Sequence, residues 1–174
     1  MFQMSERCDL DALVAFMGEP SIYWATHDRL SPQPEAVDWK KDLTEQNTFT
    51  FVGTFRGNVI GYVQFMRRTS VGAEMHLAFR ENFRGRVAKT MTTYALAQAF
   101  KEKGLLKVWG AVPTDNRLAL LAARHIGMRQ EGVLTQAIVR EEGGLRDLVL
   151  FGLTKEQFLA GQPPPRKRLN GAHP

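Results

Sequence analysis

Residues 76–90, HLAFRENFRGRVAKT, decide the fold, because a strand-like stretch meets a helical one there across a short basic turn. The turn contains Gly85 between Arg84 and Arg86, and Lys89 follows within the first helical turn. A helix start presents unpaired N–H groups and the positive end of the helix dipole, which together favour phosphate. The stretch therefore predicts a strand, a phosphate-binding turn and a helix, although such a basic turn is more often only a solvated surface.

The helix that begins in this stretch is expected to cover residues 85–103, with Gly104 ending it. Residues 105–112 are an apolar run typical of a central strand, so the helix connects two parallel strands. Small and apolar side chains recur on one stripe of the helix, with two larger ones beside it: Ala88, Met91, Ala95 and Ala99, then Leu96 and Phe100.

Hairpins are predicted on both sides of this unit. Residues 48–52 alternate, with Phe49, Phe51 and Phe55 on one face, and pair with residues 59–66 through the turn at 56–58. A third strand covers 73–80, and a last hairpin joins 132–140 to 146–153 around the turn at 141–144. The order of elements predicts a mixed α/β sheet with one parallel crossover.

The remaining segments give weaker patterns. A helix over 9–18 is capped by Asp9, residues 19–34 are expected to form a loop, and a second helix is expected over 35–45. A helix over 117–125 should bury Leu118, Leu121 and Ala122, and Gly127 should cap it. We expect one domain over 1–160 and a mobile, Pro-rich basic tail over 161–174.

Composition excludes several classes of protein. The chain has 174 residues, 44% hydrophobic, and a single cysteine, Cys8, so no intrachain disulfide forms. There is no signal peptide pattern and no apolar run of the about 20 residues that a membrane span needs. Three of the positive charges behind the net charge of +5 lie in the tail at 166–168, so no specific nucleic-acid binding is expected. His27 and His125 belong to no metal-ligand cluster in the sequence. The expected location of the protein is the cytoplasm or a larger particle such as a virion.

Phe83-Arg84-Gly85-Arg86 resembles the acetyl-CoA motif of the GNAT (Gcn5-related N-acetyltransferase) family, with Val87 where that family usually has Gly and Lys89 where it has Gly or Ala. Further matches follow downstream: Asn116, Ala119, Ile126-Gly127-Met128, Glu131-Gly132 and the stretch from Gly143 to Leu150 with Asp147. This second set is similar to the ribosomal-protein and antibiotic acetyltransferases. Residues 74–86 and 112–117 also look like GNAT proteins carried by tailed phages, which favour Arg-Gly-Arg in the turn. The resemblance covers residues 48–153 and implies a mostly antiparallel mixed sheet of about six to seven strands with flanking helices.

The resemblance also implies acetyl-CoA as co-substrate and a primary amine of a peptide, protein or small molecule as acceptor. It implies that a backbone N–H near Leu77 or Ala78 stabilises the developing oxyanion and that the same strand pairs with the pantetheine arm. The residues expected around the cofactor are Leu77, Ala78, Phe79, Arg84, Gly85, Arg86, Val87, Ala88, Lys89, Thr90 and Asn116.

Glu74 and His76 are the candidate bases, since strand alternation places both on one face, opposite Leu77. Each residue also has a structural interpretation without catalysis. Glu74 would then be an exposed strand carboxylate, and His76 a hydrogen-bonded, half-buried histidine. The tyrosine that often protonates the leaving thiolate in GNAT enzymes is replaced by Ala123. Two hypotheses therefore remain open: an N-acetyltransferase, or a GNAT-fold protein kept for binding or architecture, such as a virion or host-interaction component. Either one allows a homodimer.

Overall fold

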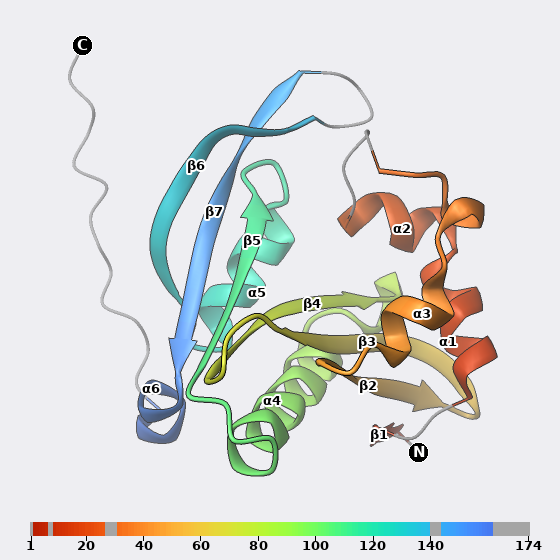
Figure 1. Ribbon diagram of the computed structural model, residues 1–174, viewed down its shortest axis with the longest axis horizontal. Helices are drawn as coiled ribbons and strands as arrows, with labels where there is room; N and C mark the ends of the chain where they lie inside the picture. The colour runs from red at the N-terminus through yellow and green to blue at the C-terminus, as the bar shows by residue number, and fades with distance from the viewer. Residues whose placement is uncertain (1, 7–8, 27–30, 140–143, 162–174) are drawn as a thin grey trace.

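The computed structural model describes residues 2–6, 9–26, 31–139 and 144–161 (Figure 1). Its centre is a seven-stranded sheet with the strand order β1-β2-β3-β4-β5-β7-β6. Neighbouring strands are antiparallel except β4 and β5, which are parallel and are connected by the crossover helix α4. The expected mixed, mostly antiparallel sheet with one parallel crossover is confirmed.

The strands are β1 (Phe2–Ser5), β2 (Thr48–Phe55), β3 (Asn58–Arg67), β4 (Gly72–Phe79), β5 (Lys107–Pro113), β6 (Arg129–Val139) and β7 (Leu145–Thr154). The α-helices are α1 (Leu10–Met17), α2 (Pro20–Thr26), α3 (Trp39–Thr44), α4 (Arg86–Lys101), α5 (Arg117–His125) and α6 (Lys155–Ala160), and the 3₁₀ turns are η1 (Pro34–Ala36) and η2 (Glu81–Phe83). The predicted strands all exist, and each boundary lies within a few residues of the expected one.

Two apolar cores lie on opposite faces of strands β2–β4. On one face α4 buries the predicted stripe, with Ala95, Leu96 and Phe100 each 0% exposed, against alternate strand residues such as Val63 and Phe65. On the other face α1, α2 and α3 cover the intervening strand residues, and their core includes Phe16, Tyr23, Trp39 and Tyr62. The sheet is thus buried on both faces in this half, which fixes the strand register because a one-residue slip would exchange the two cores.

The N-terminal region differs from expectation in three ways. The expected loop over 19–34 contains the helix α2, which begins at Pro20, a residue suited to the first turn of a helix. The expected helix over 35–45 is a 3₁₀ turn followed by the short α3, which Asp38 caps by accepting a hydrogen bond from the Lys41 N–H. Strand β1 was not expected at all, since its pairing with β2 is a long-range contact that local pattern does not record.

Helix α5 lies where it was expected but turns a different face inward. Leu118 is 64% and Leu121 48% exposed, and Ala122 is exposed too, so the prediction that these three are buried was wrong. Ala123 is buried instead, with Leu120 packed beside it. Apolar residues occupy 118–123 without interruption, so periodicity alone could not choose the buried face.

The C-terminal part ends with a helix that the sequence analysis did not predict. Thr154 and Gln157 form a reciprocal capping box at the start of α6, and the Phe158 ring packs 5.3 Å from the Phe100 ring. Cys8, His27, residues 141–143 of the last hairpin turn and the tail from 162 lie outside the described residues. No helix among the described residues is long and apolar enough to cross a membrane.

Candidate active site

Strands β4 and β5 separate soon after they begin. They are paired only at Gly72–Glu74 and Lys107–Trp109. Beyond these residues the two strands diverge, and Figure 1 shows the β5–β7 half of the sheet turned steeply away from the β1–β4 half. The divergence leaves the edge of β4 beyond Glu74 without a strand partner among the described residues, and we call this separation of β4 from β5 the gap.

The hydrogen bonds between β3 and β4 reveal which backbone groups face this gap. The backbone N–H of Arg80 donates to the Ile60 carbonyl at 2.9 Å, and the backbone N–H of Arg68 donates to the Gly72 carbonyl at 3.1 Å. Because backbone groups alternate in direction along an antiparallel pair, the even-numbered residues of β4 point toward β3. The N–H and carbonyl groups of Leu77 and Phe79 therefore point into the gap.

Ala78 lies differently from its predicted role. Its backbone groups point toward β3 by the same alternation, and its side chain, 8% exposed, packs in the core beneath the N-terminal helices. Leu77 and Phe79 fit the expectation of a strand edge open to a ligand, whereas Ala78 does not.

The turn that follows β4 leaves a helix start uncapped. Gly85 is the N-cap of α4, with φ 77° and ψ −123°, and no described side chain hydrogen-bonds there. A β-carbon on Gly85 would have no neighbour within 4 Å, so the space in front of the helix is open. The Lys89 N–H bonds to the Gly85 carbonyl at 2.9 Å, which leaves the N–H groups of Arg86, Val87 and Ala88 unused by the helix. The Lys89 N–H is not free for a ligand, because the helical bonding begins with it.

The side chains of the turn divide into two sets. Val87 and Ala88 pack against the apolar core, so the valine side chain points away from the open space in front of the helix. Arg84, Arg86, Lys89 and Thr90 are exposed. The Arg84 Nε donates to the Phe79 carbonyl at 3.3 Å, which ties the turn to the end of β4.

Glu74 and His76 lie together on the face of β4 opposite α4, as predicted. His76 Nε2 is 3.5 Å from Glu74 Oε1, and the Arg68 Nε is 3.1 Å from Glu74 Oε2. The interaction with His76, opposed by partial burial and supported by Arg68, lowers the pKa of Glu74 to about 2. A carboxylate with so low a pKa is a weak base, which argues against Glu74 as the proton acceptor.

Arg80, at the end of β4, is a functional candidate that the sequence analysis missed. Its guanidinium holds both carboxylate oxygens of Glu19, at 2.7 and 2.5 Å, and lies 5.0 Å from the centre of the Phe16 ring. Its Nε also donates to the Val59 carbonyl at 2.9 Å. Glu19 sits between α1 and α2, so this cluster joins the N-terminal helices to the strand that leads into the turn. No local signal connects residues 61 positions apart.

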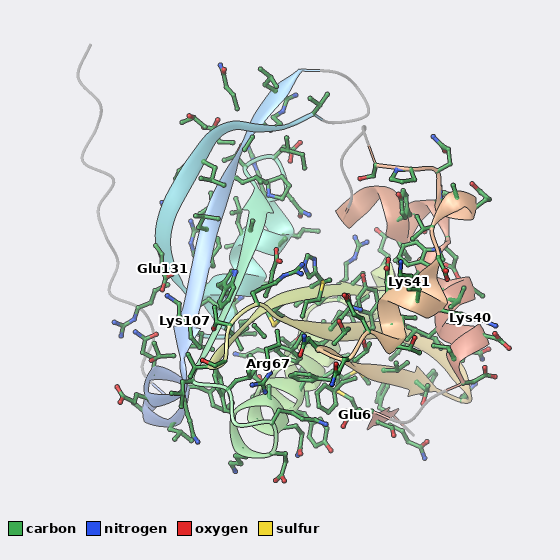
Figure 2. The ribbon with its side chains drawn as sticks, in the orientation of Figure 1. Glu6, Lys40, Lys41, Arg67, Lys107 and Glu131 are labelled. Atoms are coloured by element: carbon green, nitrogen blue, oxygen red, sulfur yellow. The ribbon has the colours of Figure 1, made fainter. Side chains whose placement is uncertain are left out.

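The downstream residues of the family pattern have structural partners. Asn116 caps α5 by accepting from the Ala119 N–H at 3.1 Å, and Ala123 is buried, where no side-chain donor is available. Glu131 lies at a bulge of β6 and pairs with Lys107 at 2.8 Å, crossing over Gly152 of β7 (Figure 2). A β-carbon at 152 would displace this carboxylate and so disturb its pair with Lys107.

Two cavities stand outside the gap. One of about 340 Å³ lies among α1, α3 and β2, and one of about 270 Å³ lies between β1 and α4. Among the described residues, no three histidine, cysteine, aspartate or glutamate side chains are grouped to hold a metal ion.

Comparison with known proteins shows which family has this fold. Residues 2–129 match the acetyltransferase (GNAT) domain family. No curated protein matches the sequence. Among solved structures, a GNAT-family acetyltransferase from Streptococcus pneumoniae is 18% identical, with a TM-score of 0.72 over 88% of this chain and 99% of that one.

Two further structures are similar to the same degree. The ribosomal-protein-S5-alanine acetyltransferase from Vibrio fischeri has a TM-score of 0.72 at 16% identity, over 90% of this chain and 94% of that one. The spermidine N-acetyltransferase from Vibrio cholerae, crystallised with CoA and spermine, has a TM-score of 0.75 at 17% identity, over 91% of this chain and 98% of that one. These likenesses support the fold, and the family match spans most of the chain. The chain therefore belongs to the GNAT acetyltransferase family, whose members are acyl-CoA-dependent N-acyltransferases that use acetyl-CoA.

Proposed function

We propose that this protein transfers an acetyl group from acetyl-CoA to a primary amine of a peptide, a protein or a small molecule, by direct attack while both substrates are bound. The observation that carries the proposal is the gap between β4 and β5, which has a strand edge along one side and the uncapped start of α4 at its end.

The gap suits the shape and charge of an acyl-CoA. The pantetheine arm is an extended chain with amide groups, so it can pair with the N–H and carbonyl groups of Leu77 and Phe79 as an added strand would. The pyrophosphate would accept hydrogen bonds from the N–H groups of Arg86, Val87 and Ala88 at the positive end of the helix dipole. Arg84, Arg86 and Lys89 supply positive charge, and the Asn116 amide remains free to donate because its oxygen caps α5.

The proposed reaction takes place at the face of β4 that carries His76. The acceptor arrives as an ammonium ion, and the neutral imidazole takes its proton, which leaves a lone pair on nitrogen for attack. The new N–C bond forms as the C–S bond breaks, and the Leu77 N–H stabilises the negative charge that develops on the carbonyl oxygen. The Glu74 carboxylate, 3.5 Å from His76 Nε2, would hold the imidazole in place. The nitrogen loses its second proton to solvent as the amide forms, and the leaving thiolate takes a proton from solvent, since Ala123 offers no donor.

The test has a binding arm and a turnover arm. Acetyl-CoA at about 100 times its Kd should stabilise the native state by about 2.7 kcal/mol and raise the Tm by roughly 5 °C or more. Thiol release from acetyl-CoA should then depend on added primary amines. No Tm shift at millimolar acetyl-CoA would refute the proposed cofactor site. A Tm shift without amine-dependent thiol release from any acceptor would refute the proposed reaction and leave the cofactor site standing.

A further inference from the structure

The face of the sheet that carries His76 continues across the gap onto the other half of the sheet. Glu74, on that face of β4, lies directly opposite Trp109 on β5, and directly opposite residues share a face. The Trp109 ring lies against Gly72, where an added β-carbon would be 2.6 Å from it. Beyond β4, the proposed reaction centre is therefore bordered by the side chains that β5, β7 and β6 present on this side (Figure 1).

These side chains are mostly apolar. Two rows of directly opposed residues cross the three strands beyond Trp109. Their apolar members, with Trp109, form a surface that we call the apolar wall: Trp109, Ala111 and Pro113 on β5, Leu148 and Leu150 on β7, and Leu134 on β6. Gly132 completes the row of Ala111 and Leu150 and adds no side chain.

The apolar wall belongs to neither of the two cores. Helix α5 packs against the opposite face of these strands, where Val149 and Phe151 are buried. Leu134, in contrast, is 47% exposed, and Leu148 and Leu150 are only half-buried. Contiguous apolar surface that a fold leaves exposed beside polar, reactive groups is typical of a ligand-binding site.

The charged groups near the apolar wall do not suit a polycation. Glu131 is already paired with Lys107 at 2.8 Å (Figure 2), and Glu74 has two partners of its own. Arg129, opposite Gly152 on the same face, adds a positive charge, and its Nε makes no hydrogen bond to a described residue. A second ammonium group against the wall would give up water and meet apolar side chains, which is costly for a charge.

The N-terminal helices bound the same site from the other side. They cover this side of the sheet as far as β4, where Ala78 packs in their core. His76, with its side chain 40% exposed, thus lies where the helical cover ends and the wall begins. The group attached to an amine at His76 therefore has the apolar wall as its neighbour across the gap.

We propose that the apolar wall binds an aliphatic or aromatic group carried by the acceptor, so that the protein acetylates primary amines with an apolar body and discriminates against polyamines. The inference rests on the proposed acetyl transfer and names the class of acceptor for the same site. The amine is deprotonated at His76, and its apolar group leaves water as it covers Ala111 and Leu150. Longer groups reach the next row, at Leu148 and Leu134. Apolar contact, rather than ion pairing, then selects the acceptor.

The test compares acceptors of graded length. Straight-chain amines from ethylamine to hexylamine keep one amino group and add methylenes, whereas spermidine adds charge. Thiol release at saturating acetyl-CoA gives kcat/KM for each amine. Leu150→Asn and Leu134→Asn make the wall polar at similar size. Leu118→Asn is the matched control, because Leu118 is a leucine on α5, 64% exposed and outside the wall.

In the wild type, kcat/KM should rise about fourfold for each methylene buried (about 0.8 kcal/mol), and hexylamine should exceed spermidine by about tenfold or more. Leu150→Asn should lower the ratio of kcat/KM for hexylamine to that for ethylamine about tenfold, and Leu134→Asn, on the edge strand, about threefold. Leu118→Asn should keep the wild-type ratio. Calorimetric titration of hexylamine into the protein–CoA complex should give a negative heat-capacity change, larger than that of shorter amines.

A ratio near one in the wild type, a preference for spermidine over hexylamine, or ratios unchanged in both wall variants would overturn the inference and leave acetyl transfer standing. If no amine of any class were acetylated, the proposed function would fall instead. Calorimetry would still decide the apolar wall in that case, because hexylamine that does not bind the CoA complex refutes it.

Discussion

The two regions that flank the gap between β4 and β5 are built from different groups. The turn region, residues 77–90, offers backbone N–H and carbonyl groups held in place by one glycine conformation and by the start of a 16-residue helix. The helical region, residues 10–44, consists of three short helices held to the sheet by side chains, such as the Arg80–Glu19 pair and the core around Tyr23. A ligand bound by backbone tolerates changes of side chain, whereas one that meets side chains is selected by them. We therefore expect the turn region to set cofactor affinity and the helical region to set the choice of acceptor.

Gly85→Ala should have the largest effect, because φ 77° with ψ −123° is a conformation that L residues avoid at a cost of order 1–3 kcal/mol. The turn would relax, its N–H groups would lose their common direction, and affinity for CoA should fall about 10- to 100-fold in titration calorimetry. Gly57→Ala is the matched control, since Gly57 has φ 81° and equally open space but lies in the β2–β3 turn. Equal CoA affinities for the two variants would refute the special role of the turn.

Arg84→Ala should weaken CoA binding about tenfold, through loss of a charge-assisted bond and of the tie to the Phe79 carbonyl. The loss should shrink at high salt, because part of the attraction is screened. Lys40→Ala controls for net charge, since Lys40 pairs with Asp11 at an exposed site on α3 (Figure 2). If both variants lost affinity equally, the effect would be one of overall charge rather than of this turn.

Glu19→Gln tests the helical region. Breaking its paired contact with Arg80 should cost about 1 kcal/mol in urea unfolding, a modest figure because both side chains are partly exposed. The acceptor KM should rise several-fold, while the acetyl-CoA Kd should stay within about twofold. The reverse pattern, a changed acetyl-CoA Kd with an unchanged acceptor KM, would contradict the division of roles between the two regions.

Glu74→Gln should give the smallest effect, a loss of stability that is present above about pH 4.5 and disappears in acid. The pKa of Glu74 is about 2 in the folded protein, below its unfolded value near 4.5, so the ionised carboxylate stabilises the fold. That contribution is complete above about pH 4.5 and disappears as the pH falls through about 2. The variant should therefore show a flatter dependence of unfolding free energy on pH in this window than the wild type does. Parallel curves would mean that Glu74 makes no favourable interaction with His76 and Arg68.

The same contrast explains what the sequence could predict. The turn region is local: the strand, Gly85 and the stripe of α4 follow one another in the chain, and all three were predicted. The helical region depends on contacts between distant residues, such as β1 with β2 and Glu19 with Arg80, and its helices of six to eight residues are too short to establish a period. In the candidate site, Leu77 and the pair of Glu74 and His76 lie as predicted. The orientation of Ala78 and the hydrogen bond of the Lys89 N–H could not be predicted without the strand register and the hydrogen bonds of the folded chain.

A crystal structure with CoA bound tests the central claim most directly. The account predicts the pantetheine arm in the gap between β4 and β5, bonded to Leu77 and Phe79, with pyrophosphate oxygens about 3 Å from the N–H groups of Arg86, Val87 and Ala88. CoA bound elsewhere, with the start of α4 left to solvent, would contradict it.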